Sequence, residues 1–190
     1  MTTDATRVMR ADAQRNRDKL LATAVDLFAS SGHDVSLEAI AKKAGVGIGT
    51  LYRHFPTREA LVEAAYRSEV DRLCDSAEEL LHDHPPDQAL AEWMDRFVSY
   101  AAAKRGMKGA LQGVVASGSP LFADAREQLR GAIATLLDAG KAAGTIRKDA
   151  DPEDVLRATG SVWQLSDEPG WQDQARRILG LLIDGLRYRA

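Results

Sequence analysis

The sequence predicts an all-α protein built from about nine helices. Along most of the chain, apolar residues recur at intervals of three and four, as they do on one face of an amphipathic helix. No stretch keeps the alternation of apolar and polar residues, flanked by hairpin turns, that is typical of a strand. The connections between the periodic segments are short, which is typical of packed helices.

Caps mark the ends of several of these helices. Gly32 and Gly144 stand just past helix ends, where a left-handed backbone favours glycine. Ser36 and Thr57 are placed to cap helix starts. Asp151-Pro152 combines a cap with proline at the first helical position. The expected helices cover about residues 18–31, 36–44, 48–54, 57–81, 90–101, 107–116, 120–142, 152–163 and 171–186.

Charge is distributed unevenly along the chain, although the formal total is only −3. Residues 1–60 hold nine Lys and Arg against seven Asp and Glu, whereas residues 61–190 hold sixteen against twenty-one. Five of the nine basic residues fall between Arg7 and Lys19, which predicts a disordered basic arm before the first apolar helix. The negative total disfavours non-specific coating of nucleic acid, whereas the basic arm is suited to facing phosphate.

The composition narrows the class of protein. Hydrophobic residues make up 45% of the chain and charged residues 28%, as in ordinary globular domains. A single cysteine excludes an internal disulfide and a four-thiolate zinc site. Neither a membrane-spanning run nor an apolar signal segment is evident. We therefore expect a cytoplasmic protein with no membrane partner, no metal and no cofactor.

The segment SLEAIAKKAGVGIGTLYRHFPTR, residues 36–58, carries the most specific signal. Two short helices flank a tight turn at residues 44–47, an arrangement typical of a helix-turn-helix whose second helix enters the DNA major groove. Thr50 offers a methyl group to a thymine methyl and a hydroxyl to a base edge. Side chains here that can donate a hydrogen bond to phosphate, which positions a protein without reading sequence, are Tyr52, His54 and Arg58.

These residues resemble the DNA-binding domain of the TetR family of transcriptional regulators. The resemblance is close from about Leu20 to Leu61 and implies a homodimer that places the helix at residues 48–54 of each subunit in successive major grooves of a pseudo-palindromic operator. It also implies a basic arm and helix-turn-helix head over residues 1–56, and an effector-binding and dimerisation domain over residues 57–190. The motifs that carry the resemblance are Gly45-Val46, Gly49-Thr50-Leu51-Tyr52, His54-Phe55 and Arg58.

The resemblance assigns roles within this segment. Ser36 would cap its helix and bond phosphate, and positions 48–50 lie where the family contacts bases. Ile48 departs from the commoner polar or basic residue and cannot hydrogen-bond guanine, so base reading rests on Thr50, Arg53, thymine methyls and DNA shape. Packing in the core is the alternative role for Tyr52 and Phe55, and we expect it for Phe55. The expected DNA-binding residues are Ser36, Ile48, Gly49, Thr50, Tyr52, Arg53, His54 and Arg58.

Aromatic residues of the second domain allow two interpretations. Trp93, Phe97 and Tyr100 share one side of an expected helix. They form either an ordinary core or the wall of an apolar cavity for an aromatic or aliphatic effector, with polar contacts from Tyr100 and Gln112. The candidate effector-binding residues are Trp93, Phe97, Tyr100, Met107, Leu111, Gln112, Val115 and Trp163.

Glycines in the last two expected helices indicate close helix approach. Gly160, Gly180 and Gly185 each cost about 1 kcal/mol relative to alanine inside a helix. The resemblance implies that these two helices form a four-helix bundle between subunits. The candidate dimer-interface residues are Trp163, Ile178, Leu182 and Leu186.

We therefore expect a ligand-responsive DNA-binding regulator, and specifically a repressor released from a palindromic operator by a small apolar or aromatic molecule. An enzyme is disfavoured, because Gly45-x-Gly47-x-Gly49 lacks the strand and the Lys-Ser/Thr of a phosphate loop, and no nucleophile motif occurs. Two alternatives stay open: a ligand-binding helical protein or enzyme that no longer uses the head for DNA, and a helical adaptor without a ligand. We expect His82-Asp83-His84 to be an exposed turn rather than a metal site, and Cys74 to be a core residue rather than a redox sensor.

Overall fold

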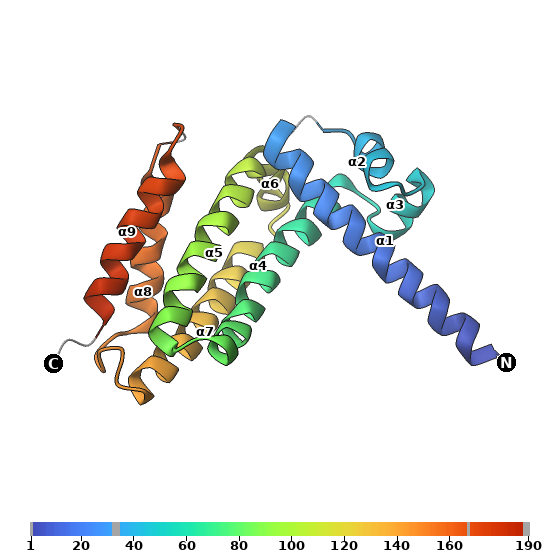
Figure 1. Ribbon diagram of the computed structural model, residues 1–190. Coiled ribbons are helices and arrows are strands. Elements are labelled where there is room, and N and C mark those ends of the chain that lie inside the picture. Colours follow the sequence, from blue (N-terminus) through green and yellow to red (C-terminus); the bar gives the residue numbers. More distant parts are fainter. Residues whose placement is uncertain (1, 32–34, 167, 188–190) are drawn as a thin grey trace. The chain divides into compact units, whose positions relative to one another are not determined.

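The computed structural model describes residues 2–31, 35–166 and 168–187 (Figure 1). Over these residues the backbone forms nine α-helices, one 3₁₀ helix and no strand, which confirms the all-α prediction. The helices are α1 (Thr2–Ser31), α2 (Leu37–Ala44), α3 (Ile48–His54), α4 (Arg58–Asp83), α5 (Pro86–Gly106), α6 (Lys108–Ala116), α7 (Leu121–Ala142), α8 (Pro152–Thr159), η2 (Gly160–Gln164) and α9 (Trp171–Leu186).

The chain divides into two compact units of opposite charge. Unit 1 comprises Met1–Ser68 and Ala103–Leu121, and unit 2 comprises Glu69–Ala102 and Phe122–Ala190. Thirteen Lys and Arg against eight Asp and Glu give unit 1 a formal charge of +5, whereas twelve against twenty give unit 2 a charge of −8. The predicted domain boundary after residue 56 stays a prediction. The difference in formal charge between these units is larger than the difference between residues 1–60 and residues 61–190.

Helix α1 is longer than the sequence predicts. It begins at Thr2, so the disordered arm expected before residue 18 is wrong. Residues 2–31 contain neither glycine nor proline, so no residue interrupts the helix. Arg15 pairs with Asp12, and Gln14 donates to the Asp18 carboxylate at 2.7 Å, one turn apart in each case. These local pairs favour helix where the charge pattern alone favours disorder. The cap expected at Gly32 lies outside the described residues.

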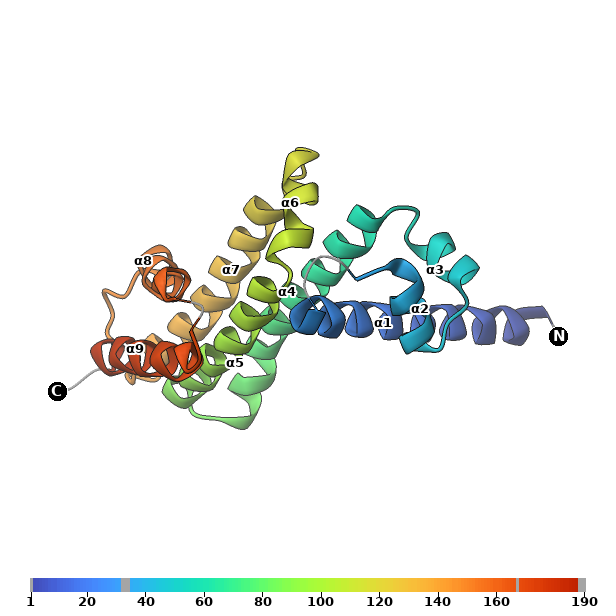
Figure 2. The ribbon, with the colours of Figure 1, turned by 90° about the horizontal axis from the view of Figure 1, so that it is seen from above.

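The head within unit 1 is a three-helix arrangement, in which α2 and α3 lie against α1 (Figure 2). Its core is apolar and draws on every helix: Leu20, Ala24 and Phe28 of α1, Ile40 of α2, and Leu51 of α3 are fully or almost fully buried. Phe55, directly after α3, is also buried, as the sequence predicts. Packing on α1 therefore holds the short helix α3, which is too short to be stable in isolation.

In unit 2 the end of α7 is tightly packed. After α7 the chain reverses through Gly144, whose φ of 71° is left-handed, and Thr145 and Ile146 donate backbone hydrogen bonds to the carbonyl of Gly140 at 2.9 and 3.2 Å. Ile146 is buried against α7. Its neighbour Arg147 donates a backbone hydrogen bond to Leu186 at 2.9 Å, which ties this turn to the end of α9.

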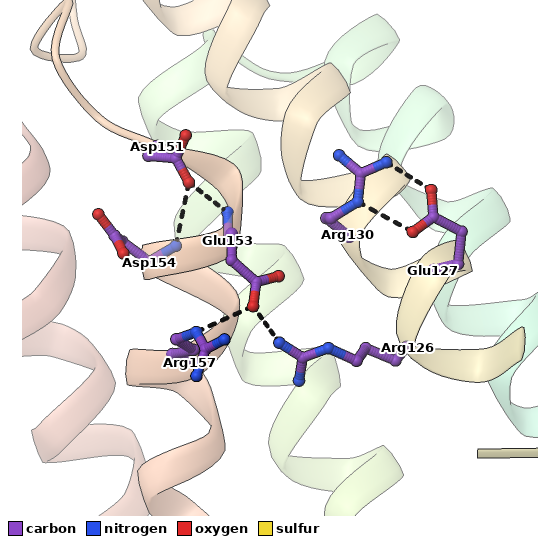
Figure 3. Close-up of polar contacts among 7 residues, drawn as sticks. All are labelled: Arg126, Glu127, Arg130, Asp151, Glu153, Asp154 and Arg157. Carbon is purple, nitrogen blue, oxygen red and sulfur yellow. Dashed lines mark hydrogen bonds and ion pairs between the residues drawn. The ribbon is translucent and has the colours of Figure 1, made fainter. Parts of the chain in front are cut away.

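Polar contacts join α8 to α7 (Figure 3). The Asp151 carboxylate caps α8 as predicted, accepting hydrogen bonds from the backbone N–H groups of Glu153 at 2.8 Å and Asp154 at 3.3 Å. The Glu153 carboxylate pairs with Arg126 of α7 and with Arg157, the latter at 2.9 Å. The helix expected over residues 152–163 is divided, because α8 ends at Thr159 and the chain tightens into η2 from Gly160 onward.

Candidate nucleic-acid interface

The turn between α2 and α3 is fixed by local hydrogen bonds. Ser36 Oγ accepts a hydrogen bond from Ala39 N at 3.1 Å, which confirms it as the cap of α2. At the other end Gly45 adopts a left-handed φ of 67° and donates to the backbone carbonyl of Lys42, and Val46 donates to Ala41 at 2.9 Å. The cap bond uses the Ser36 hydroxyl as acceptor, so its hydrogen can donate to a phosphate.

Helix α3 presents an apolar outer face. Leu51 points into the head, whereas Ile48 and Tyr52, four residues apart, are 39% and 45% exposed. This exposure contradicts the alternative that Tyr52 packs in the core. Gly49, which follows Ile48, is also exposed, and a side chain added there would meet no described atom within 4 Å. The chain's own packing therefore does not explain Gly49, and its small size leaves the backbone open to a close partner.

The remaining predicted side chains of α3 differ in exposure. Arg53 is exposed, whereas Thr50 and His54 are half-buried. The His54 ring lies 6.2 Å from that of Phe55, so one side of the imidazole faces the head. Lys42 and Lys43, in the last turn of α2, are exposed and add positive charge to the same unit. The structure thus brings together apolar, hydroxyl and basic groups on and around α3.

Arg58 is engaged within the head. Its guanidinium lies over the ring of Phe28, with 5.2 Å between Cζ and the ring centroid, and donates a hydrogen bond to the backbone carbonyl of Val35. A second arginine, Arg17, lies in the same way over Phe55, at 5.1 Å. Sequence reasoning placed Arg17 in a disordered arm and expected a phosphate contact from Arg58. Neither ring contact has a signal in the local sequence, because each joins residues far apart in the chain.

The candidate effector residues fall into both units. In unit 2, Trp93, Phe97 and Tyr100 are buried, and Trp163 is half-buried with its ring edge-on to Phe97 at 6.1 Å and to Tyr100 at 6.2 Å. Trp93 Nε1 donates to the carbonyl of Leu73 at 2.9 Å. These contacts are those of a filled aromatic core.

The remaining candidates lie in unit 1, where Met107 and Leu111 are buried. Gln112 and Val115 are exposed on α6. Exposure places these two side chains outside the core of the unit, so the predicted set does not form one continuous wall within either unit.

The candidate dimer residues of α9 lie along one flank. Leu186 is buried within the unit, and Ile178 and Leu182 are half-buried. Leu181, which sequence reasoning missed, is 74% exposed and shares their spacing of three and four residues. Among the described residues, a Cβ added at Gly180 or Gly185 would meet no atom within 4 Å, so these glycines serve no close helix approach within that part of the chain.

Two minor candidates are resolved by exposure and charge. His82, Asp83 and His84 are exposed at the end of α4, and among the described residues no group of three or more potential ligands could hold a metal ion. Cys74 is half-buried. Burial, followed by the charges of Asp71 and Asp75, raises the pKa of its thiol to about 12, which disfavours the reactive thiolate. Within the described ranges, no helix has the length and apolarity to span a bilayer.

Comparisons with known proteins agree with this geometry. The family model for bacterial regulatory proteins of the TetR family matches residues 20–65, and the model for the C-terminal domain of SbtR-like transcriptional regulators matches residues 85–188. The HTH-type transcriptional regulator SAR0097 of Staphylococcus aureus is 38% identical over 81 residues, which are 41% of this chain and 42% of that protein. The match to this curated relative therefore spans less than half of its length.

Two solved structures are similar over nearly their whole length. The TetR transcriptional regulator SCO0520 from Streptomyces coelicolor is 52% identical with a TM-score of 0.84, covering 92% of this chain and 99% of that one. A TetR transcription regulatory protein from Mycobacterium vanbaalenii is 37% identical with a TM-score of 0.77, covering 95% and 99%. With a C-terminal family model that covers more than half of the sequence, the chain belongs to the TetR family of DNA-binding transcriptional regulators.

Proposed function

We propose that this protein is a homodimeric repressor that binds a pseudo-palindromic operator through α3 and releases it when unit 2 binds a small apolar or aromatic molecule. The observation that carries the DNA-binding part is the outer face of α3, where Ile48 and Tyr52 are exposed one turn apart and Gly49 is exposed as well. Exposed large apolar side chains with no role in their own core are typical of a binding surface.

The exposed groups divide into two roles. Ile48 and the Thr50 methyl read thymine methyl groups, and Thr50 Oγ1 and Arg53 read base edges. Ser36, Tyr52 and His54 donate to phosphates and fix the register of α3 on the duplex. Gly49 lets the backbone of α3 approach the floor of the groove. Since Ile48 supplies no hydrogen bond, the operator is expected to be read largely through A·T pairs and through its shape.

The flank of α9 supports the homodimer. Ile178, Leu181 and Leu182 form an apolar strip that the described chain leaves partly uncovered, and a Cβ added at Gly185, which lies among them, would meet no described atom within 4 Å. A second copy packed on this strip buries the leucines and gives the glycine its close approach. The dimer is needed for a palindromic operator, because its two-fold symmetry matches that of the DNA.

The aromatic cluster of unit 2 supports effector binding. Trp93, Phe97, Tyr100 and Trp163 together present a large polarisable surface, and Trp163 lies at its edge on the short helix η2. An apolar ligand enters by displacing ring contacts around Trp163. The cost of breaking these contacts is offset by the ring surface that the ligand covers.

A titration of the DNA that flanks the protein's own gene tests the proposal. Fluorescence anisotropy is expected to show specific binding that weakens steeply as salt is raised. Tyr52→Phe removes one phosphate donor per subunit and is expected to lower affinity by about tenfold for all sequences alike. Thr50→Val, by contrast, is expected to change the preferred sequence.

Small apolar or aromatic molecules that raise the melting temperature of the protein are then added to the same titration. We expect them to release the protein from the operator. Circular dichroism verifies that each variant is folded. Binding of all DNA sequences with equal affinity by the wild-type protein would contradict the proposal.

A further inference from the structure

We infer that Arg58 and Arg17 are positioning residues, which fix α3 for DNA binding by clamping the head from within and do not themselves contact phosphate. The inference rests on the proposed use of α3 as the recognition helix. The charge of these two arginines alone favours contact with DNA phosphate. The aromatic rings beside them favour a role in positioning α3.

The first clamp joins three segments of the head. Arg58 is the first residue of α4, its guanidinium lies 5.2 Å from the ring centroid of the fully buried Phe28 of α1, and it donates to the carbonyl of Val35. Val35 directly precedes Ser36, the cap of α2. One side chain therefore ties the start of α4 to α1 and to the entry of α2, on both sides of the helix-turn-helix segment.

The second clamp holds the other end of the segment. Arg17 of α1 lies 5.1 Å over the ring of Phe55, which is the residue that ends α3 and donates its backbone N–H to Leu51 at 2.8 Å. The two clamps are opposite in direction: α4 reaches α1 through Arg58, and α1 reaches the end of α3 through Arg17. Together they fix both ends of the chain that runs from α2 through α3.

The chemistry of the Arg58 site favours arginine over lysine. A planar guanidinium stacks on an aromatic face and at the same time donates in its plane to a carbonyl, whereas a lysine ammonium is a strongly hydrated point charge. A phosphate contact tolerates lysine better, because an ammonium binds phosphate as a point charge. The substitution of arginine by lysine therefore separates the two roles while it keeps the charge.

The experiment compares Arg58→Lys and Arg58→Met with Arg53→Met, which removes an exposed arginine that the proposed function places at base edges. For each, operator affinity, non-specific affinity and the salt dependence of both are measured. We expect both Arg58 variants to lose up to about tenfold in operator affinity, as estimated for a partly desolvated cation–ring contact. The ratio of specific to non-specific affinity falls with it, because a displaced α3 misses base edges but not the backbone. Arg17→Lys is expected to behave in the same way.

The salt dependence of DNA binding distinguishes a phosphate contact from a positioning role. The slope of log K against log salt is negative. Loss of one phosphate contact per subunit reduces its magnitude by about 0.9 for each contact, or about 1.8 for the dimer. We expect no such decrease for Arg58→Met, which removes the charge, nor for Arg58→Lys, which keeps it. A double variant of Arg58→Met with Phe28→Leu is expected to lose less affinity than the two single losses combined, because both changes break the same contact.

Several results would overturn the inference. Wild-type affinity in Arg58→Lys, with a reduced slope in Arg58→Met, identifies a phosphate contact. Equal losses of specific and non-specific affinity, with a fall in the folded fraction measured by circular dichroism, identify a role in folding alone. Failure of the wild-type protein to bind any operator is a different result, since it removes the proposed function before the variants are compared.

Discussion

Leu181→Arg is expected to convert the dimer to a monomer and to weaken operator binding by at least about 100-fold. Leu181 is 74% exposed on α9, so the substitution leaves the core of the subunit intact. In a dimer packed on this flank, the arginine buries an unpaired charge between two copies. A monomer binds only a half-site and loses the gain of about 10²–10⁴ that comes from linking two heads. Light scattering and anisotropy measure the two effects.

Ala123→Arg is the matched control, since Ala123 is exposed on α7 and lies outside the apolar strip of α9. This variant adds the same charge to the same unit and is expected to remain dimeric with wild-type affinity. Both variants are expected to keep their melting temperature at concentrations where the wild type is monomeric. A Leu181→Arg protein that scatters as a dimer and binds the operator normally would contradict the assignment of this flank.

Gly140→Ala is expected to destabilise the protein by about 1–3 kcal/mol, the range for overpacking a well-filled core. An added Cβ at Gly140 would lie 2.3 Å from Ile146 Cγ1 and 2.9 Å from Ile146 Cβ. Ile146 is buried and β-branched, so it cannot rotate away freely. Backbone hydrogen bonds from Thr145 and Ile146 to the carbonyl of Gly140 fix the turn that holds it there. Denaturant unfolding with an unchanged m-value measures the loss.

The same helix supplies the control. At Gly131 of α7 an added Cβ would meet no atom within 4 Å. Gly131→Ala is therefore expected to stabilise by up to about 1 kcal/mol through helix propensity alone. The two substitutions are chemically identical and opposite in expected sign. If both stabilise the protein equally, Ile146 does not pack on α7 in the way described.

Local chemistry made much of the fold predictable from the sequence. Ser36 and Asp151 each form the cap that the pattern predicts, because capping depends on residues within one turn of the helix end. The short helix at residues 48–54 was also predicted to its bounds. On α3 the sequence leaves a core role open for Tyr52, and its 45% exposure excludes that role.

Contacts between distant residues were not predictable in this way. Arg17 and Arg58 appear in the sequence as charges suited to solvent or phosphate, and only the fold brings the rings of Phe55 and Phe28 under them. No local pattern marks residue 140 as a position that requires glycine. The requirement arises because the chain reverses and places Ile146 against α7. The sequence predicts too short a first helix, because its clustered charge favours disorder, whereas local side-chain pairs and the lack of glycine and proline favour helix from Thr2.

The central claim, that the outer face of α3 lies against base edges, is tested most directly by a cycle between Ile48 and the thymine methyl groups. Each thymine of the operator is replaced singly by deoxyuridine, which removes only the C5-methyl group, and affinity is measured for the wild-type protein and for Ile48→Ala.

At the thymines that Ile48 contacts, which lie at equivalent positions of the two half-sites, each single replacement is expected to weaken wild-type binding about fourfold, as for one buried methyl group. It is expected to have little further effect on Ile48→Ala. Equal losses in both proteins at every thymine would contradict the account, because Ile48 would then contact no base.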